Sequence, residues 1–147
     1  MLFTSETNAL IWRNGPETVR IEPWGADSLR VRATHGAAIR SDLPGALGAA
    51  PPALSDAEIA IGPERAGIRC GLIRADVTAE GQISFTNAAT GAALLSEPAP
   101  RFIHPPARWF KPLGSDLSRV SVEFEAVEGE RFYGLGQHQH GLLDQKG

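Results

Sequence analysis

The chain has 147 residues, a length that suits one domain with its own hydrophobic core. Hydrophobic residues make up 42% and charged residues 21%, which is the composition of a globular protein and excludes a disordered or fibrous one. The formal net charge is −3 and no basic stripe is present, so nucleic acid is not an expected partner.

The N-terminal stretch, MLFTSETNALIWRNG, lacks the charged n-region and long apolar h-region of a signal peptide. No run reaches the roughly 18 apolar residues that cross a membrane. If Met1 is the natural start, we expect a cytoplasmic protein without a membrane partner. Cys70 is the single cysteine, which excludes an internal disulfide and a cysteine-based zinc site. Its apolar surroundings, AGIRCGLIRADV, predict a buried thiol.

Two segments near the N-terminus, TVRIEPW and SLRVRAT, alternate between apolar and polar residues. A period of two predicts half-buried strands, with one face on a core and one in water. The predicted inward residues are Val19, Ile21 and Pro23 in the first segment and Leu29, Val31 and Ala33 in the second.

The middle of the chain predicts further strands in EIAIG, AGIRCGLIRADV and GQISFTN. Residues 75–97 read as a meander of three strands joined by two tight turns, at Glu80-Gly81 and at 87–91. Residues 43–57 are rich in Ala, Gly and Pro, so we expect an irregular, mobile loop there. Further turns are expected at residues 14–16, 25–27 and 128–129.

The last third of the chain contains a proline-rich segment and then a clear strand pattern. Five prolines between residues 96 and 114 exclude a central strand and favour a long connection or an edge segment. In RVSVEFEAV, polar residues alternate with the predicted inward residues Val120, Val122, Phe124 and Ala126. With no helical stripe anywhere, the fold predicted is an all-β, antiparallel sandwich of two packed sheets with eight to ten short strands, forming a single domain over residues 1–147.

The last nineteen residues, GERFYGLGQHQHGLLDQKG, resemble the end of the N-terminal domain in glycoside hydrolase family 31, the α-glucosidases and α-xylosidases. Residues 133–136 match the family's YGLG signature, with Glu-Arg-Phe before it. Residues 136–147 are similar to the bacterial α-xylosidase-type branch, although Gln137 stands where the family more often has Glu. Upstream, residues 17–36 and 83–97 fit the family's opening strand pair and a later hairpin.

The resemblance implies a galactose-mutarotase-like β-sandwich followed by a catalytic (β/α)₈ barrel. That barrel carries the two carboxylates that hydrolyse α-glycosides with retention, and it needs about 250 residues. The family's nucleophile motif occurs nowhere in this chain. We therefore expect a non-catalytic domain, inactive alone, whose residues 129–147 lead toward the barrel of an enzyme that acts on an α-glycoside or oligosaccharide. The expected partners are that barrel and a second copy pairing through the exposed docking face, and no cofactor is expected.

The resemblance also implies that the terminal segment lends a loop to the substrate pocket. Carbohydrate hydroxyls pair well with planar amides and carboxylates. His138 and His140 project to one face of an extended segment, but a third and fourth metal ligand are not recognisable, so no metal site is expected. Gly134, Gly136 and Gly141 fit close backbone approach better than a phosphate loop. The substrate-loop candidates are Gln137, His138, Gln139, His140, Asp144, Gln145 and Lys146.

Two other functions remain open at this point. A free-standing carbohydrate-binding sandwich would use an exposed tryptophan as a sugar platform, with Trp12, Trp24 and Trp109 as candidates, although each also fits core or interdomain packing. A free-standing enzyme or metal protein would depend on the two histidines of HQH. Five aspartates are expected in turns or loops and form no acid/base pair: Asp27, Asp42, Asp56, Asp76 and Asp116.

Overall fold

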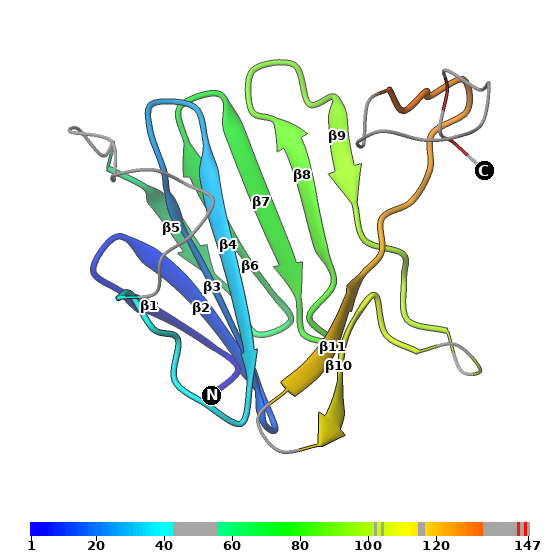
Figure 1. The fold of residues 1–147 in the computed structure, drawn as a ribbon. Helices are drawn as coiled ribbons and strands as arrows, with labels where there is room; N and C mark the ends of the chain where they lie inside the picture. The colour runs from blue at the N-terminus through cyan, green and yellow to red at the C-terminus, as the bar shows by residue number, and fades with distance from the viewer. Residues whose placement is uncertain are drawn as a thin grey trace.

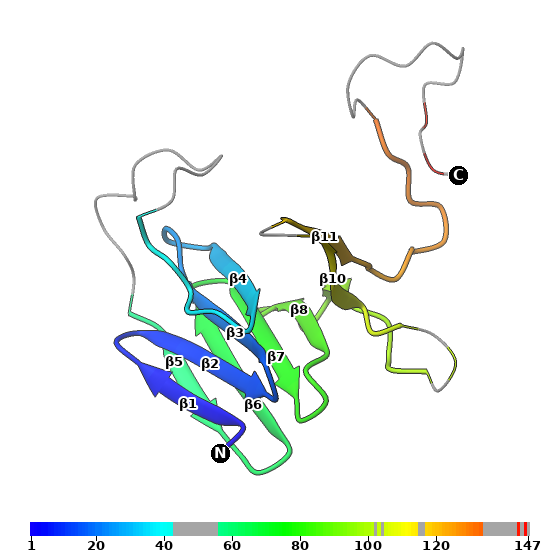
Figure 2. The same ribbon diagram turned by 60° about the horizontal axis from the view of Figure 1, so that its bottom comes forward.

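The fold is all-β and antiparallel, as the sequence predicts. The computed structural model describes residues 1–42, 56–101, 103, 105–114, 117–133, 144 and 146, and these form eleven strands and no helix. Figures 1 and 2 show two sheets packed face to face, with a two-stranded ribbon beside them. The sandwich prediction is confirmed, and the described strands are more numerous than the eight to ten expected. This part of the chain contains no helix able to span a lipid bilayer.

Within each sheet, strands that are consecutive in sequence pair with one another, so each sheet is a meander of hairpins. The first sheet contains β1 (Phe3–Glu6), β2 (Ala9–Asn14), β3 (Glu17–Pro23) and β4 (Leu29–His35). The second contains β5 (Glu58–Ile61), β6 (Arg65–Cys70), β7 (Ile73–Thr78), β8 (Ile83–Asn87) and β9 (Ala93–Ser96). The ribbon contains β10 (Arg108–Gly114) and β11 (Leu117–Val122).

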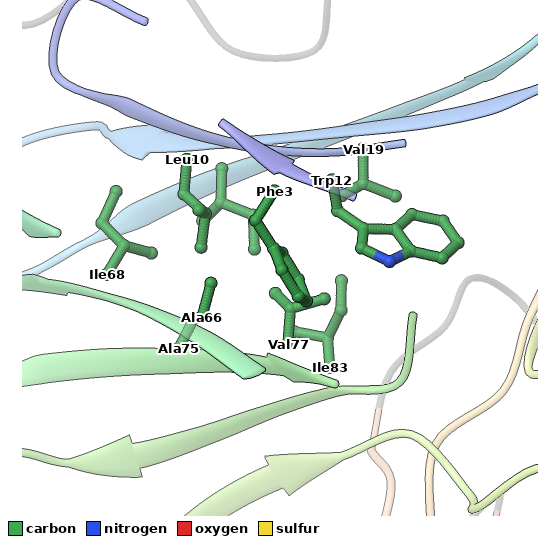
Figure 3. Packing of buried hydrophobic residues seen from close by; sticks show 10 residues of the cluster. Phe3, Leu10, Trp12, Val19, Ala66, Ile68, Ala75, Val77 and Ile83 are labelled. Atoms are coloured by element: carbon green, nitrogen blue, oxygen red, sulfur yellow. The ribbon is translucent and has the colours of Figure 1, made fainter. Parts of the chain in front are cut away.

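The hydrophobic core lies between the two larger sheets (Figure 3). The alternation predicted for β3 is confirmed, because Val19, Ile21 and Pro23 are all buried. The β1–β2 hairpin was not among the predicted elements. Residues 9–12 of β2 are buried in succession, so this strand lacks the period of two that a water-exposed face produces. The core side chains are Phe3, Leu10, Trp12, Val19, Ile21, Ala66, Ile68, Ala75, Val77 and Ile83.

The burial of residues in β4 and in β11 differs from the sequence prediction. In β4, Leu29 and Ala33 pack against the core as expected, whereas Val31 is exposed. Strand β11 ends at Val122. The inward residues predicted there are not buried: Val120, Val122 and Phe124 are 55%, 49% and 46% exposed, and Ala126 is exposed too. The prediction of a half-buried strand is therefore wrong for the described residues, because no layer among them covers this face of the ribbon.

The turns follow their predicted chemistry with one exception among the aspartates. The β7–β8–β9 meander is confirmed, and AGIRCGLIRADV divides into β6 and β7 at a turn. Asp76 lies within β7 rather than in a turn, where it accepts two hydrogen bonds from the Arg74 side chain on the same strand. Asp27, Asp42 and Asp56 lie outside the strands as predicted. Asp116 and residues 43–55 fall outside the described residues.

The proline-rich segment behaves as an edge element. Residues 97–107 contain no strand among their described positions, and Pro112 lies in β10 of the two-stranded ribbon, where every strand is an edge. The pairing of β10 with β11 shifts register between Pro112 and Gly114. A proline in this position costs no interior ladder hydrogen bond.

Gly81 is a position where a side chain does not fit. Its φ is +87°, and an added Cβ would lie 2.4 Å from an atom of the Trp12 ring. We expect Gly81→Ala to destabilise the domain by about 2–4 kcal/mol, from left-handed backbone strain plus overpacking. Gly15→Ala is the matched control, since Gly15 has a φ of +55° and open space around it. Urea unfolding should show a clearly smaller loss for Gly15→Ala, and equal losses would contradict the overpacking at Trp12.

Candidate functional site

Most of the predicted substrate loop falls outside the described residues. Gln137, His138, Gln139, His140 and Gln145 are among the positions that the structure does not describe, as are Gly134, Gly136 and Gly141. Their assignment to a sugar site stays a prediction. Asp144 and Lys146 are the members of the set that can be placed.

Asp144 and Lys146 bind the stretch of chain that precedes the YGLG motif. The Asp144 carboxylate accepts hydrogen bonds from the backbone N–H of Phe132 at 2.9 Å and of Lys146 at 3.1 Å. The Lys146 ammonium donates to the carbonyl of Val127 at 2.7 Å and lies 3.6 Å from the Glu130 carboxylate. These contacts hold both side chains against residues 127–132.

The three tryptophans occupy three different environments. Trp12 is buried in the core and donates from its indole N–H to the carbonyl of Ala79 at 3.1 Å, so core packing is confirmed and a sugar platform is excluded. Trp24 is half-buried, and the Arg30 guanidinium lies 4.5 Å from its ring centroid. Trp109 is half-buried on the ribbon.

A polar hollow of about 300 Å³ lies beside Trp24. It is lined in part by Glu22, Arg30 and Arg32, and Glu22 accepts a hydrogen bond of 2.7 Å from Arg32. These charged groups bind one another, and Arg30 occupies a face of the indole that a sugar ring would need. The arrangement stabilises the outer face of the first sheet and does not favour sugar stacking there.

No metal centre is evident in the part of the chain that the structure describes. Among those residues, no three His, Cys, Asp or Glu side chains gather as a metal site would require. Cys70 is a buried free thiol, as the sequence predicts, and its sulfur lies 3.3 Å from the carbonyl oxygen of Gly25.

The most unusual polar feature is a buried cluster around Arg108, the first residue of β10. Its guanidinium donates to the Glu17 carboxylate at 3.0 Å, to the Gly81 carbonyl at 2.7 Å and to the carboxylate of Glu97. The side chains of Arg108 and Glu97 are only 7% and 3% exposed. The second oxygen of Glu97 accepts from the backbone N–H of Ile83 at 2.8 Å, so the carboxylate is fully used.

This cluster, which we call the Arg108 clamp (Glu17, Gly81, Glu97 and Arg108), joins the three sheets. Glu17 begins β3 in the first sheet, whereas Gly81 precedes β8 and Glu97 follows β9 in the second. The clamp therefore fixes the ribbon to both layers of the sandwich. The clamp cannot be predicted from the sequence, because Arg108 and Glu17 are 91 residues apart and no local pattern links them.

Next to the clamp, an apolar cleft of about 410 Å³ lies between the ribbon and the two larger sheets. Phe110 of β10 stacks on His35 at the end of β4, with ring centroids 5.8 Å apart, and so joins the ribbon to the first sheet. Glu97 and Arg108 contribute the charged part of its wall. The other lining residues are Val31, Ala33, Ile83, Phe85, Leu95, Phe110, Val120, Val122 and Phe124.

Comparison with known proteins relates this chain to much longer enzymes. No family model matches the chain. A curated protein from Pseudescherichia vulneris, described as a family 31 glucosidase, is 34% identical over 95% of this chain. The crystal structure of a GH31 α-xylosidase from a soil metagenome, complexed with xylose, matches 97% of the chain with a TM-score of 0.80 and 31% identity.

The match covers only a small part of each relative. The chain corresponds to 29% of the length of the Pseudescherichia protein and to 23% of the α-xylosidase chain. Nearly the whole of this sequence therefore aligns with a domain-sized portion of proteins that are more than three times as long.

Proposed function

Since the chain corresponds in sequence and fold to the N-terminal β-sandwich of glycoside hydrolase family 31 enzymes, we propose that it supports the catalytic barrel of a larger α-glycosidase without carrying out the chemistry itself. One observation carries this proposal: the alignment spans 95% of this chain but 29% of the curated relative. A domain that fills so small a share of an enzyme leaves room for a barrel of about 250 residues elsewhere.

Three carboxylates, those of Glu17, Glu97 and Asp144, are bound to other groups of the chain, which supports a non-catalytic role for them. Retaining glycosidases need two carboxyl groups about 5–5.5 Å apart on either side of the scissile bond. The two carboxylates of the Arg108 clamp are bound to a guanidinium, and the Glu97 side chain is only 3% exposed. Asp144 is held by backbone N–H groups of its own segment.

The parent enzyme that we propose hydrolyses an α-glycoside of glucose or xylose with retention. The names of the relatives support this range, because one is described as a glucosidase and the other as an α-xylosidase. We further propose that the predicted substrate loop lines one side of the substrate pocket, with Gln137, His138, Gln139, His140, Asp144, Gln145 and Lys146 as its candidate residues. In support, the described residues 123–133, which precede this loop in the chain, lead away from the body of the sandwich (Figure 2).

The test compares the chain alone with a complete enzyme that contains it. We expect the purified chain to release no 4-nitrophenol from 4-nitrophenyl α-D-xylopyranoside or α-D-glucopyranoside. The same chain, exchanged for the matching region of the soil-metagenome α-xylosidase, should support hydrolysis of the xyloside. Hydrolysis by the isolated chain, or a folded but inactive exchange protein, would contradict the proposal.

A further inference from the structure

The apolar cleft has the composition of a hydrophobic core that lacks one wall. Aliphatic and aromatic side chains from β4, β8, β9 and both strands of the ribbon converge on it. Several of them remain exposed in the described structure, among them Val31, Leu95, Val122 and Phe124. Contiguous apolar surface of this kind marks a binding surface rather than an ordinary water-exposed face.

The sequence of β11 indicates what kind of surface this is. In β11 and the two residues that follow it, apolar residues at 120, 122 and 124 alternate with polar residues, which is the pattern of a strand with one face on a core. The described structure leaves those apolar residues more exposed than the intervening Ser121, which is only partly exposed. The strand therefore carries a core-facing pattern on the cleft side, and the described residues do not cover it.

The ribbon also has a free strand edge next to this surface. Strand β11 pairs with β10 on one side and with no other described strand. A two-stranded hairpin is only marginally stable, and three or more strands with an apolar face are the usual stable unit. The unpaired N–H and C=O groups of such an edge are a template for one more strand.

This inference rests on the proposed function, in which the chain is one part of a larger enzyme. The segment that occupies the apolar cleft therefore comes from the rest of that enzyme. We propose that an extended segment with alternating apolar residues, from the part of the family 31 enzyme outside this region, adds as a strand to the free edge of β11. Its inward side chains fill the apolar cleft beside Val120 and Val122. The relatives have the chain to supply it, since this region accounts for 29% and 23% of their lengths.

A small ligand and a second copy fit the cleft less well. Small-molecule sites need a few convergent polar groups, whereas Arg108 and Glu97 are bound to each other and to their clamp partners. A symmetric dimer places the same patch on both subunits, and two hollows of about 410 Å³ facing each other do not fill one another. An extended segment can cover the apolar wall of the cleft with its side chains and hydrogen-bond to the free edge of β11 with its backbone.

The experiment measures whether Val122 is covered in the complete enzyme. Val122→Cys places a thiol on the cleft, and Leu72→Cys is its matched control in the β6–β7 turn. The native residues are 49% and 52% exposed, and the native Cys70 is buried and so gives little background. Each variant is prepared in the isolated chain and in the exchange protein with the soil-metagenome α-xylosidase, and thiol labelling is followed by peptide mass spectrometry.

We expect Val122→Cys to react at least about tenfold more slowly in the exchange protein than in the isolated chain, with Leu72→Cys unchanged. Hydrogen exchange should show newly protected backbone amides along β11 in the exchange protein. Equal labelling of Val122→Cys in both proteins would overturn the inference. Slow labelling without protection of β11 would overturn the added strand.

Two further outcomes distinguish a failure of this inference from a failure of the proposed function. If the isolated chain sediments as a dimer and Val122→Asp makes it monomeric, a second copy occupies the cleft and the inference fails. If the exchange protein with the native insert folds but is inactive, the proposed function fails. An active exchange protein in which Val122→Cys labels rapidly overturns only the inference.

Discussion

The variant Arg108→Met should lower the free energy of unfolding by about 3–5 kcal/mol, because it leaves the buried Glu97 carboxylate without its cationic partner. It also removes the donors to Glu17 and to the Gly81 carbonyl, so the ribbon loses the hydrogen bonds of this guanidinium to both larger sheets. For a domain of this size the thermal midpoint should fall by on the order of 10 °C. Urea unfolding followed by circular dichroism measures the effect.

The control for this prediction is Arg13→Met in the exposed ion pair with Glu6. Arg13 lies 2.9 Å from Glu6 and lowers the pKa of that carboxyl, but both side chains are largely in water. Its loss should cost no more than about 1 kcal/mol. Adding Glu97→Gln to Arg108→Met should recover part of the stability, because the neutral amide can still accept from Ile83. If Arg108→Met costs no more than Arg13→Met, the clamp does not hold the ribbon.

Trp12→Ala should be comparably destabilising, with an expected loss of about 3–5 kcal/mol. The indole is part of the core cluster, donates to the carbonyl of Ala79 and fits against the bare Cα of Gly81. Truncation opens a large cavity at the end of the core nearest the clamp, since the Arg108 guanidinium lies 6.0 Å from the ring centroid. The measurement is again the free energy of unfolding in urea.

Trp24→Ala is the matched control for the loss of an indole. Trp24 is half-buried and its interaction with Arg30 is worth roughly 0.5–1 kcal/mol, so the variant should lose about 1 kcal/mol. A loss for Trp12→Ala as small as that for Trp24→Ala would contradict the placement of Trp12 in the core.

The strands that the sequence predicts correctly are those with one face in water. Strand β3 shows this, since Arg20 and Glu22 alternate with buried residues and produce a readable period of two. Strand β2 lacks that period because residues 9–12 are all buried, and the hairpin that contains it was missed. Periodicity reports the contrast between two faces, so a strand covered on both sides cannot be recognised by it.

The features of the candidate site also differ in whether the sequence can predict them. The YGLG motif at 133–136 is a short sequence signature, and the family that it indicates is supported by both relatives. The Arg108 clamp depends on residues that three sheets bring together. The sequence near Arg108 contains no pattern that predicts its partners. The alternation in β11 predicts a half-buried strand, but its apolar residues are exposed in the part of the chain that the structure describes.

The meander connectivity of the two larger sheets has a consequence for how the chain folds. Because every strand pairs with a sequence neighbour, hydrogen bonding within each sheet closes only short loops. The first sheet can form its hairpins on the ribosome before β5 is synthesised, and the second can do so before the ribbon emerges. The contacts between residues far apart in sequence then form in two late events. The two larger sheets pack over the core, and Arg108 binds its partners in the clamp. We expect the ribbon to be the last element to become protected during refolding.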